Sequence, residues 1–166
     1  MENSKESYEK QIELYQEKIN EIWDKNEATN LVEAEFTEEE ADCLVSHFLN
    51  MGTLSMRVDA REDAMEYYSV GYFLAYKHFG EFDERTLKQS YNMACVDMFS
   101  ENPEEQLESI RQLEYCYYDM REHLGETNQY TKTARKLLKK FSENPDQLYK
   151  DHLRMRKMIQ ESFEKK

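Results

Sequence analysis

Residues 50–80, NMGTLSMRVDAREDAMEYYSVGYFLAYKHFG, contain the pattern that decides the fold. Three small residues, Gly52, Ala64 and Gly71, are spaced through this stretch, and the aromatic Tyr68 lies between the last two. Small side chains let two helices approach closely, and an aromatic ring fills the space beside them. We therefore expect two antiparallel helices, joined by a short turn and tightly packed on each other.

The chain repeats short motifs at a nearly constant spacing. Three of them occur twice, at offsets of 42, 42 and 45 residues: LNMGTLSM (49–56) and YNMACVDM (91–98), FSENP (99–103 and 141–145), and HFGE (78–81) and HLGE (123–126). A period of this length covers two helices, and it is typical of solenoids that stack helix pairs.

The first helix pair resembles a known repeat family. Phe48, Gly52, Ala64, Tyr68 and Gly71 have the spacing of the bulky, small, small, aromatic and small positions of the tetratricopeptide repeat (TPR). The long second helices, each ended by a glycine, are similar to the 42-residue variety of this repeat in kinesin light chains.

This resemblance covers residues from about Thr37 to Phe163. It implies an all-α fold, a short right-handed α-solenoid of antiparallel helix pairs. The repeat domain would span 37–166 with about 2.5 to 3 repeats. Residues 1–36 lack the pattern and are expected to form an N-terminal capping helix and an acidic connection, because an exposed solenoid end needs a cap.

Periodicity and helix-end signals place about seven helices along the chain. We expect them at 4–25, 37–56, 61–79, 83–100, 103–124, 130–142 and from Pro145 toward Phe163. Thr37 with Glu40 forms a capping-box pattern, and Pro103 suits a first helical position. Gly80 and Gly125 are expected to end their helices.

The composition favours an intracellular helical protein. Among 166 residues only four are Gly and two are Pro. The three cysteines, Cys43, Cys95 and Cys116, are widely spaced and odd in number, which argues against a disulfide framework and a zinc site. No signal peptide and no apolar run of spanning length is visible in this sequence, so we expect a cytoplasmic protein without membrane contact.

Charge is distributed unevenly over the chain, whose net charge is −13. Residues 1–40 hold 13 acidic and 4 basic side chains, whereas residues 132–166 hold 11 basic and 5 acidic ones. Direct nucleic-acid binding is disfavoured, because phosphate recognition draws on clustered Lys and Arg over a whole face.

The sequence contains no recognisable catalytic arrangement. Phosphate-binding glycine loops, nucleophile elbows and the H-E-x-x-H zinc motif are absent, and the four histidines are far apart in the sequence. Cys95 is better explained as a small buried residue than as a nucleophile. We therefore expect no enzyme, no cofactor and no metal site.

The resemblance also implies a binding surface. In this family the first helix of each pair lines a concave groove, and asparagines at the slot of Asn50 and Asn92 bind the backbone of an extended peptide. A carboxamide suits this role because it donates and accepts hydrogen bonds. The third repeat offers Ala134 at this slot. By the same register the other predicted groove residues are Ser46, Leu49, Thr53, Met56, Arg57, Lys88, Tyr91, Cys95, Met98 and Phe99.

Three functional hypotheses follow. The first is a peptide- or protein-binding TPR scaffold, an adaptor or regulator whose partner carries a basic or amphipathic segment. The second is an acidic decoy that inhibits a nucleic-acid-binding or defence complex, and whose binding would be lost as salt rises. The third is a homodimeric structural module, because a short solenoid leaves apolar ends exposed.

Overall fold

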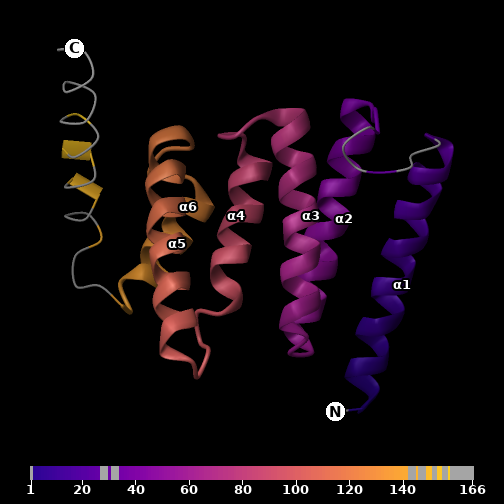
Figure 1. Ribbon diagram of the computed structural model, residues 1–166, viewed down its shortest axis with the longest axis horizontal. Coiled ribbons are helices and arrows are strands. Elements are labelled where there is room, and N and C mark those ends of the chain that lie inside the picture. The colour runs from indigo at the N-terminus through magenta and orange to yellow at the C-terminus, as the bar shows by residue number, and fades with distance from the viewer. Residues whose placement is uncertain are drawn as a thin grey trace.

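The computed structural model describes residues 2–26, 30, 34–141, 145, 149–150, 153–154 and 157 (Figure 1). Within these residues the chain forms α-helices and no strand: α1 Glu2–Lys25, α2 Glu38–Arg57, α3 Arg61–Phe79, α4 Glu84–Val96, α5 Pro103–His123 and α6 Gln129–Leu138. Each helix packs on the next in chain order, and α2 also touches α4. The predicted all-α class and the pairing of adjacent helices are confirmed.

The helix ends follow the expected signals. The Thr37 side chain accepts a hydrogen bond from the backbone N–H of Glu40 (3.2 Å), and the Glu40 carboxylate accepts one from the Thr37 N–H (3.0 Å). This capping box satisfies two donors that the first turn of α2 would otherwise leave unpaired. Gly80 has φ +93°, the left-handed region that glycine enters without steric cost, and it ends α3.

Two predicted helices end earlier than expected. The helix predicted at 83–100 ends at Val96, and Met98 beyond it is completely buried. The Met98 carbonyl oxygen accepts a hydrogen bond from Gln106 Nε2 of α5 (3.2 Å). This contact between α5 and the segment after α4 is found where the last helical turn was expected. The helix predicted at 130–142 ends at Leu138. The predicted seventh helix lies largely outside the described residues.

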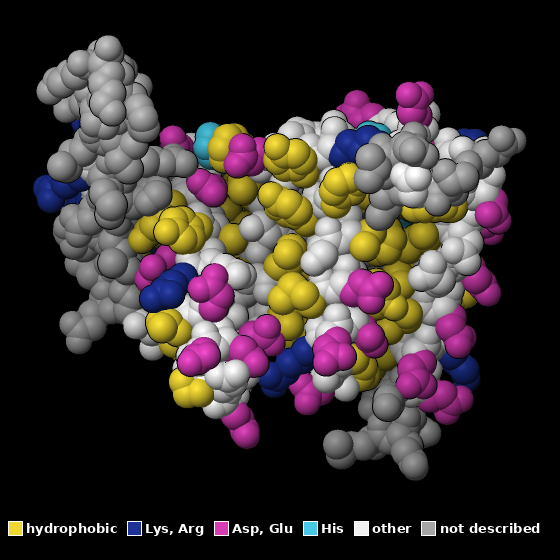
Figure 2. Space-filling model, in the orientation of Figure 1, with side chains coloured by type: hydrophobic (Ala, Val, Ile, Leu, Met, Phe, Trp, Pro, Cys, Tyr) yellow, Lys and Arg dark blue, Asp and Glu magenta, His cyan; other side chains and the backbone are white. Residues whose placement is uncertain are grey.

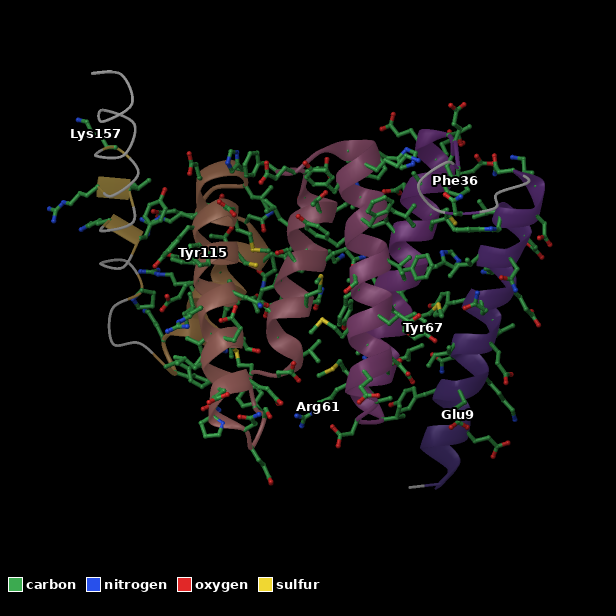
Figure 3. The ribbon with its side chains drawn as sticks, viewed as in Figure 1. Glu9, Phe36, Arg61, Tyr67, Tyr115 and Lys157 are labelled. Carbon is green, nitrogen blue, oxygen red and sulfur yellow. The ribbon has the colours of Figure 1, made fainter. Side chains whose placement is uncertain are left out.

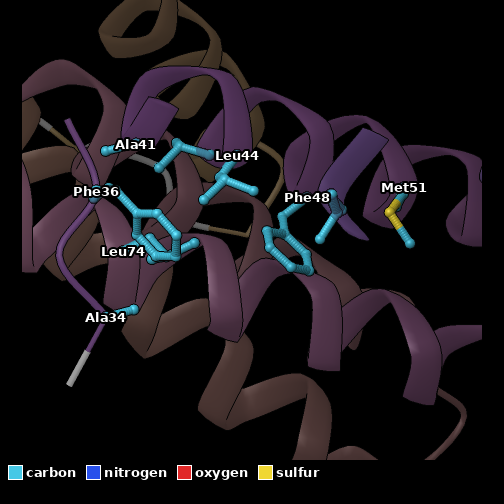
Figure 4. Close-up of a cluster of buried hydrophobic side chains, with 10 residues drawn as sticks. Ala34, Phe36, Ala41, Leu44, Phe48, Met51 and Leu74 are labelled. Atoms are coloured by element: carbon cyan, nitrogen blue, oxygen red, sulfur yellow. The ribbon is translucent and has the colours of Figure 1, made fainter. Parts of the chain in front are cut away.

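The N-terminal part of the core joins α1, α2, α3 and the connection before α2 (Figure 4). Ile19 of α1 is buried there, and Tyr67 of α3 points toward α1 (Figure 3). Ala34 and Phe36 of the connection, which was predicted only as a polar link, are also buried, and the Ala34 carbonyl accepts from Lys77 Nζ (2.7 Å). One end of this connection is thus part of the core.

The glycines of the first pair mark close contacts between helices. A Cβ atom added to Gly52 would lie 2.5 Å from Cε1 of the buried Tyr68 ring, which confirms the predicted close packing of α2 and α3. A Cβ added to Gly71 would lie 2.5 Å from Nε2 of Gln89, a completely buried residue of α4. Gly71 therefore leaves room for a side chain that crosses α3.

Candidate functional site

Two contacts fix how α2 and α4 align. Arg85 Nη1 lies 2.9 Å from Asp42 Oδ1, and Gln89 Nε2 donates a hydrogen bond to the Val45 carbonyl oxygen (3.0 Å). The paired residues are 43 and 44 positions apart, close to the 42-residue sequence repeat. Since α2 and α4 run in the same direction, Asn50 and Asn92 differ in height by only about 1.5–3 Å along the two helix axes.

The two asparagines differ in their local hydrogen bonding. Asn50 is exposed, and its carboxamide makes no hydrogen bond with the described residues. Asn92 is half-buried, and its Nδ2 donates to the Lys88 carbonyl oxygen one turn earlier (2.8 Å). The hydrogen bond holds the Asn92 carboxamide in one orientation, whereas the Asn50 carboxamide can orient toward a binding partner.

We call the accessible residues of α2 and α4 around these asparagines the α2–α4 face: Ser46, Asn50, Arg57, Lys88, Asn92 and Phe99. Among the described residues Phe99 is the most exposed large hydrophobic side chain, at 62%, and it lies just beyond the end of α4. Its ring centroid lies 6.1 Å from that of Phe141, and Lys140 Nζ lies 5.8 Å from it. The face therefore combines amide, cationic and aromatic groups.

The remaining predicted residues of α2 point toward α4 and α3 instead. Leu49 and Met56 are half-buried against the cluster of Ala64, Tyr68 and Val96. The Thr53 hydroxyl donates to the Leu49 carbonyl (2.9 Å) and lies 3.3 Å from the Tyr68 hydroxyl. These residues hold the two helices together. Ser46, Asn50 and Arg57 are the predicted residues of α2 that point outward, and the Arg57 guanidinium lies 5.8 Å from the centre of the Tyr8 ring of α1.

On α4 the predicted residues divide in the same way. Met98 is completely buried, so its prediction as a groove residue is corrected to a core position, and Ala134 of α6 is buried as well. The half-buried Tyr91 lies edge-on to Tyr130 of α6, with ring centroids 6.4 Å apart. The Lys88 ammonium lies 5.0 Å from the same Tyr130 ring, a cation–π contact that keeps it on the surface.

Cys95 is predicted as a groove residue, and the structure places it half-buried beside Tyr91. Burial raises the pKa of the Cys95 thiol to about 12, although a hydrogen bond with Tyr91 acts in the opposite direction. Burial likewise raises the pKa of Tyr91. At neutral pH the thiol of Cys95 is protonated, as is typical of a buried cysteine.

Charge on the α2–α4 face differs from the average of the chain. The acidic residues of α2 and α4 all lie within the first five positions of these helices. Their negative charge there interacts favourably with the positive end of the helix dipole. Arg57 and Lys88 follow them, and α6 beside them carries Lys132, Arg135 and Lys136 without any acidic residue. Beyond the first turns of α2 and α4, the charged residues of the face and of the neighbouring α6 are therefore basic, in a chain of net charge −13.

Sequence reasoning missed two residues that position this face. Gln89 of α4 reaches past Gly71 of α3 and contacts α2. The only sign of this in the sequence is Gly71 itself, because a small residue in a helix indicates that another side chain packs closely against it. Arg85 contacts Asp42 of α2 and Asp83, and its guanidinium carbon lies 3.3 Å from the centre of the Phe79 ring. The paired carboxylate of Asp83 is the main reason why the pKa of Arg85 is raised, so the arginine stays charged.

Comparison of the chain with protein-family models, with curated proteins and with solved structures found no match. Within the described residues no helix has the length and apolar character needed to cross a membrane. The same residues contain no group of three or more His, Cys, Asp or Glu side chains placed to hold a metal ion.

Proposed function

We propose that this chain is a TPR-like scaffold that binds an extended segment of a partner protein across the α2–α4 face. The observation that carries this proposal is the register of α2 and α4, which brings Asn50 and Asn92 to nearly the same height on neighbouring helices. Two carboxamides in such a row can pair with successive peptide groups whatever the partner's side chains are. On this proposal the helix pairs stack as a short right-handed solenoid.

The neighbouring groups indicate what else the partner presents. Phe99 provides an exposed apolar contact, and Lys88 and Arg57 provide positive charge on either side of the asparagines. A segment with a backbone free to hydrogen-bond, an apolar side chain and an acidic or neutral flank suits this face best. This differs from the basic partner expected from the net charge, because the acidic residues of α2 and α4 lie at the N-terminal ends of these helices, away from Arg57 and Phe99.

A displayed library of random peptides tests the proposal. Wild-type protein is compared with the double variant Asn50→Ala/Asn92→Ala, and peptides enriched by the wild type are measured at low and moderate salt. The expected result is binding that survives moderate salt and weakens about tenfold or more in the double variant, because two sets of peptide hydrogen bonds are lost. Asn20→Ala on the exposed surface of α1 is the matched control and should leave binding unchanged.

Two results would overturn this function. If the double variant binds the enriched peptides as well as the wild type does, the asparagines do not form a peptide site. If binding is lost equally in both proteins as salt rises, the acidic-decoy hypothesis is favoured, because general electrostatic attraction is screened at high ionic strength. Light scattering on the same samples tests the homodimer.

A further inference from the structure

A second surface lies on the side of the molecule formed by α3 and α5. Both helices pack on α4, which lies between them (Figure 1). Figure 2 shows a column of hydrophobic side chains along the edge of α3 that faces α4 and α5, with acidic side chains around its lower part. Asn92 of α4 lies on the outer surface, whereas Asp97, the residue directly after the end of α4, lines this second surface.

The hydrophobic column is formed mainly by large side chains of α3, with the small polar Ser69 between Met65 and Tyr72. Met65, Tyr72 and Tyr76 of α3 are seven and four residues apart, so they share one face of the helix. The rings of Tyr72 and Tyr76 stack with centroids 6.1 Å apart, and Tyr76 is 50% exposed. At the far end Phe82 stacks on His123 of α5, with ring centroids 3.8 Å apart. Met65 to Tyr76 spans about 16 Å, or three helical turns.

The rim of this surface is acidic. A depression of about 460 Å³ at its lower end is lined by Met65 and Val96 and by the carboxylates of Glu62, Glu66 and Asp97. Arg61 also lines it, but its Nε is paired with Asp59 Oδ1 at 3.1 Å. Figure 3 shows Arg61 between the lower ends of α3 and α5, where it also lowers the pKa of Glu105, although less than the hydrogen bonds of Ser100 and Asn102 do.

The negative field continues along the wall. Tyr72 has a raised pKa, for which burial is the largest cause, and Glu81 and Asp119 add to it through their charge. Carboxylates from α3 and α5, from the segment after α4 and from the turn after α3 therefore lie around one mainly apolar strip. We call this strip and its rim the α3–α5 groove.

We infer that the α3–α5 groove binds a basic amphipathic helix of a partner protein. An apolar wall three turns long fits a helix that presents hydrophobic residues at i, i+4, i+7 and i+11. The acidic rim matches Lys and Arg on both flanks of such a stripe, and it would speed their approach at low ionic strength. This site is separate from the α2–α4 face and does not depend on the function proposed for it.

The test uses two synthetic helical peptides and the full-length chain. Both peptides, of about 18 residues, carry Leu at i, i+4, i+7 and i+11, and one has Lys and Arg at the flanking positions where the other has Glu. Fluorescence anisotropy should show that the basic peptide binds and that the acidic one binds about tenfold more weakly or worse. Equal binding of the two peptides, or no binding of either, would overturn the inference.

A pair of charge-reversal variants locates the site. Glu62→Lys/Glu66→Lys changes two exposed carboxylates one turn apart on the rim, and Glu13→Lys/Glu17→Lys makes the same change on α1. The first pair should weaken the basic peptide about tenfold, whereas the second should change binding by less than about twofold. Equal effects of the two pairs would mean that net charge, and not this groove, attracts the peptide.

Two further variants separate the sources of binding. Tyr76→Gln removes an exposed ring from the apolar wall and should weaken the basic peptide, whereas Asn50→Ala/Asn92→Ala should leave its affinity unchanged. If the asparagine variant loses the basic peptide, the peptide occupies the α2–α4 face and the inference is wrong. Self-association of the wild type through the groove, seen by light scattering and abolished by Tyr76→Gln, would assign a second copy as the occupant instead.

Discussion

The α2–α3 and α4–α5 pairs repeat one plan with different side chains at their contacts. In the first pair Gly52 and the buried Ala64 let the helices approach until Tyr68 fills the space between them. In the second pair, 42 residues later, Ala94 and Gln106 hold these positions, and Gln106 bonds the Met98 carbonyl across the gap (3.2 Å).

The sequence repeat therefore corresponds to the alignment of α2 with α4, whereas the side-chain packing inside the two pairs differs. The first pair depends on steric fit, so it should respond strongly to added volume. The second pair places a polar side chain at the same point, half-exposed, and should tolerate truncation.

The largest effect is expected from exchanging the residue types at this position. Ala64→Gln would place a longer, polar side chain at a completely buried site, and we expect it to lower the free energy of unfolding by more than about 3 kcal/mol. Gln106→Ala removes one hydrogen bond and should cost about 0.5–1.5 kcal/mol. Urea unfolding followed by circular dichroism measures both, and similar losses would show that the two pairs do not differ as described.

The next effect concerns the close contact itself. Gly52→Ala adds a methyl group 2.5 Å from the Tyr68 ring, which cannot move away freely because it is buried. We expect a loss of about 1–3 kcal/mol, although alanine is the better helix former. Ala94→Gly at the matching position should cost about 1–2 kcal/mol, through helix propensity and the loss of one buried methyl group, and not through steric overlap.

A double variant supplies the control for this prediction. Tyr68→Leu removes the ring that the added methyl group would meet, so Gly52→Ala should cost less in that background than in the wild type. A cost that is the same in both backgrounds would mean that the methyl group is accommodated elsewhere.

The sequence predicted the parts of the fold that depend on local signals. The all-α class, the capping box at Thr37, the end of α3 at Gly80 and the close packing at Gly52 follow from residues that are near one another in the chain or have special geometry. The early end of α4 was not predictable, because it results from a bond between Met98 and Gln106 whose geometry only the packed helices define.

The candidate site was predicted less completely than the fold. The motif register predicts equivalent positions for Asn50 and Asn92, and the structure places Asn50 on the surface and Asn92 half-buried; the same register also predicts Met98 beside them, and this residue is core. A repeat pattern fixes which positions are equivalent, whereas burial depends on the neighbouring helix. The α3–α5 groove had no sequence signal of its own, because Met65 and Tyr76 look like ordinary core residues until α5 is placed.

Helix capping should give a smaller effect that again compares the two pairs. Thr37→Ala removes the hydroxyl that caps the Glu40 N–H in α2 and should cost about 1 kcal/mol, while Thr37→Ser should restore most of it. Asp83→Ala removes the cap of α4 and also the carboxylate that pairs with Arg85 Nε (2.8 Å), so its cost should be larger. Thermal unfolding monitored by circular dichroism measures the series, and equal costs for Thr37→Ala and Asp83→Ala would mean that the Arg85 pair adds nothing.

The smallest effect is expected from acid, and it concerns how α1 joins the first pair. The pKa of Glu40 is lowered from 4.5 to about 2, first by its hydrogen bond with Lys25 of α1 and then by the Thr37 N–H. Because the folded state holds this carboxylate ionised, its contribution to the stability of the fold is present above about pH 4.5 and is lost as the pH falls toward 2.

Trp23, the only tryptophan, packs near Phe36 with ring centroids 5.8 Å apart and reports the position of α1. We expect its fluorescence to change within this pH window in the wild type and to change less there in Glu40→Gln. The same pH profile in both proteins would show that the contact of Lys25 with Glu40 does not hold α1 in place, and that the apolar contacts of Ile19 and Phe36 do so alone.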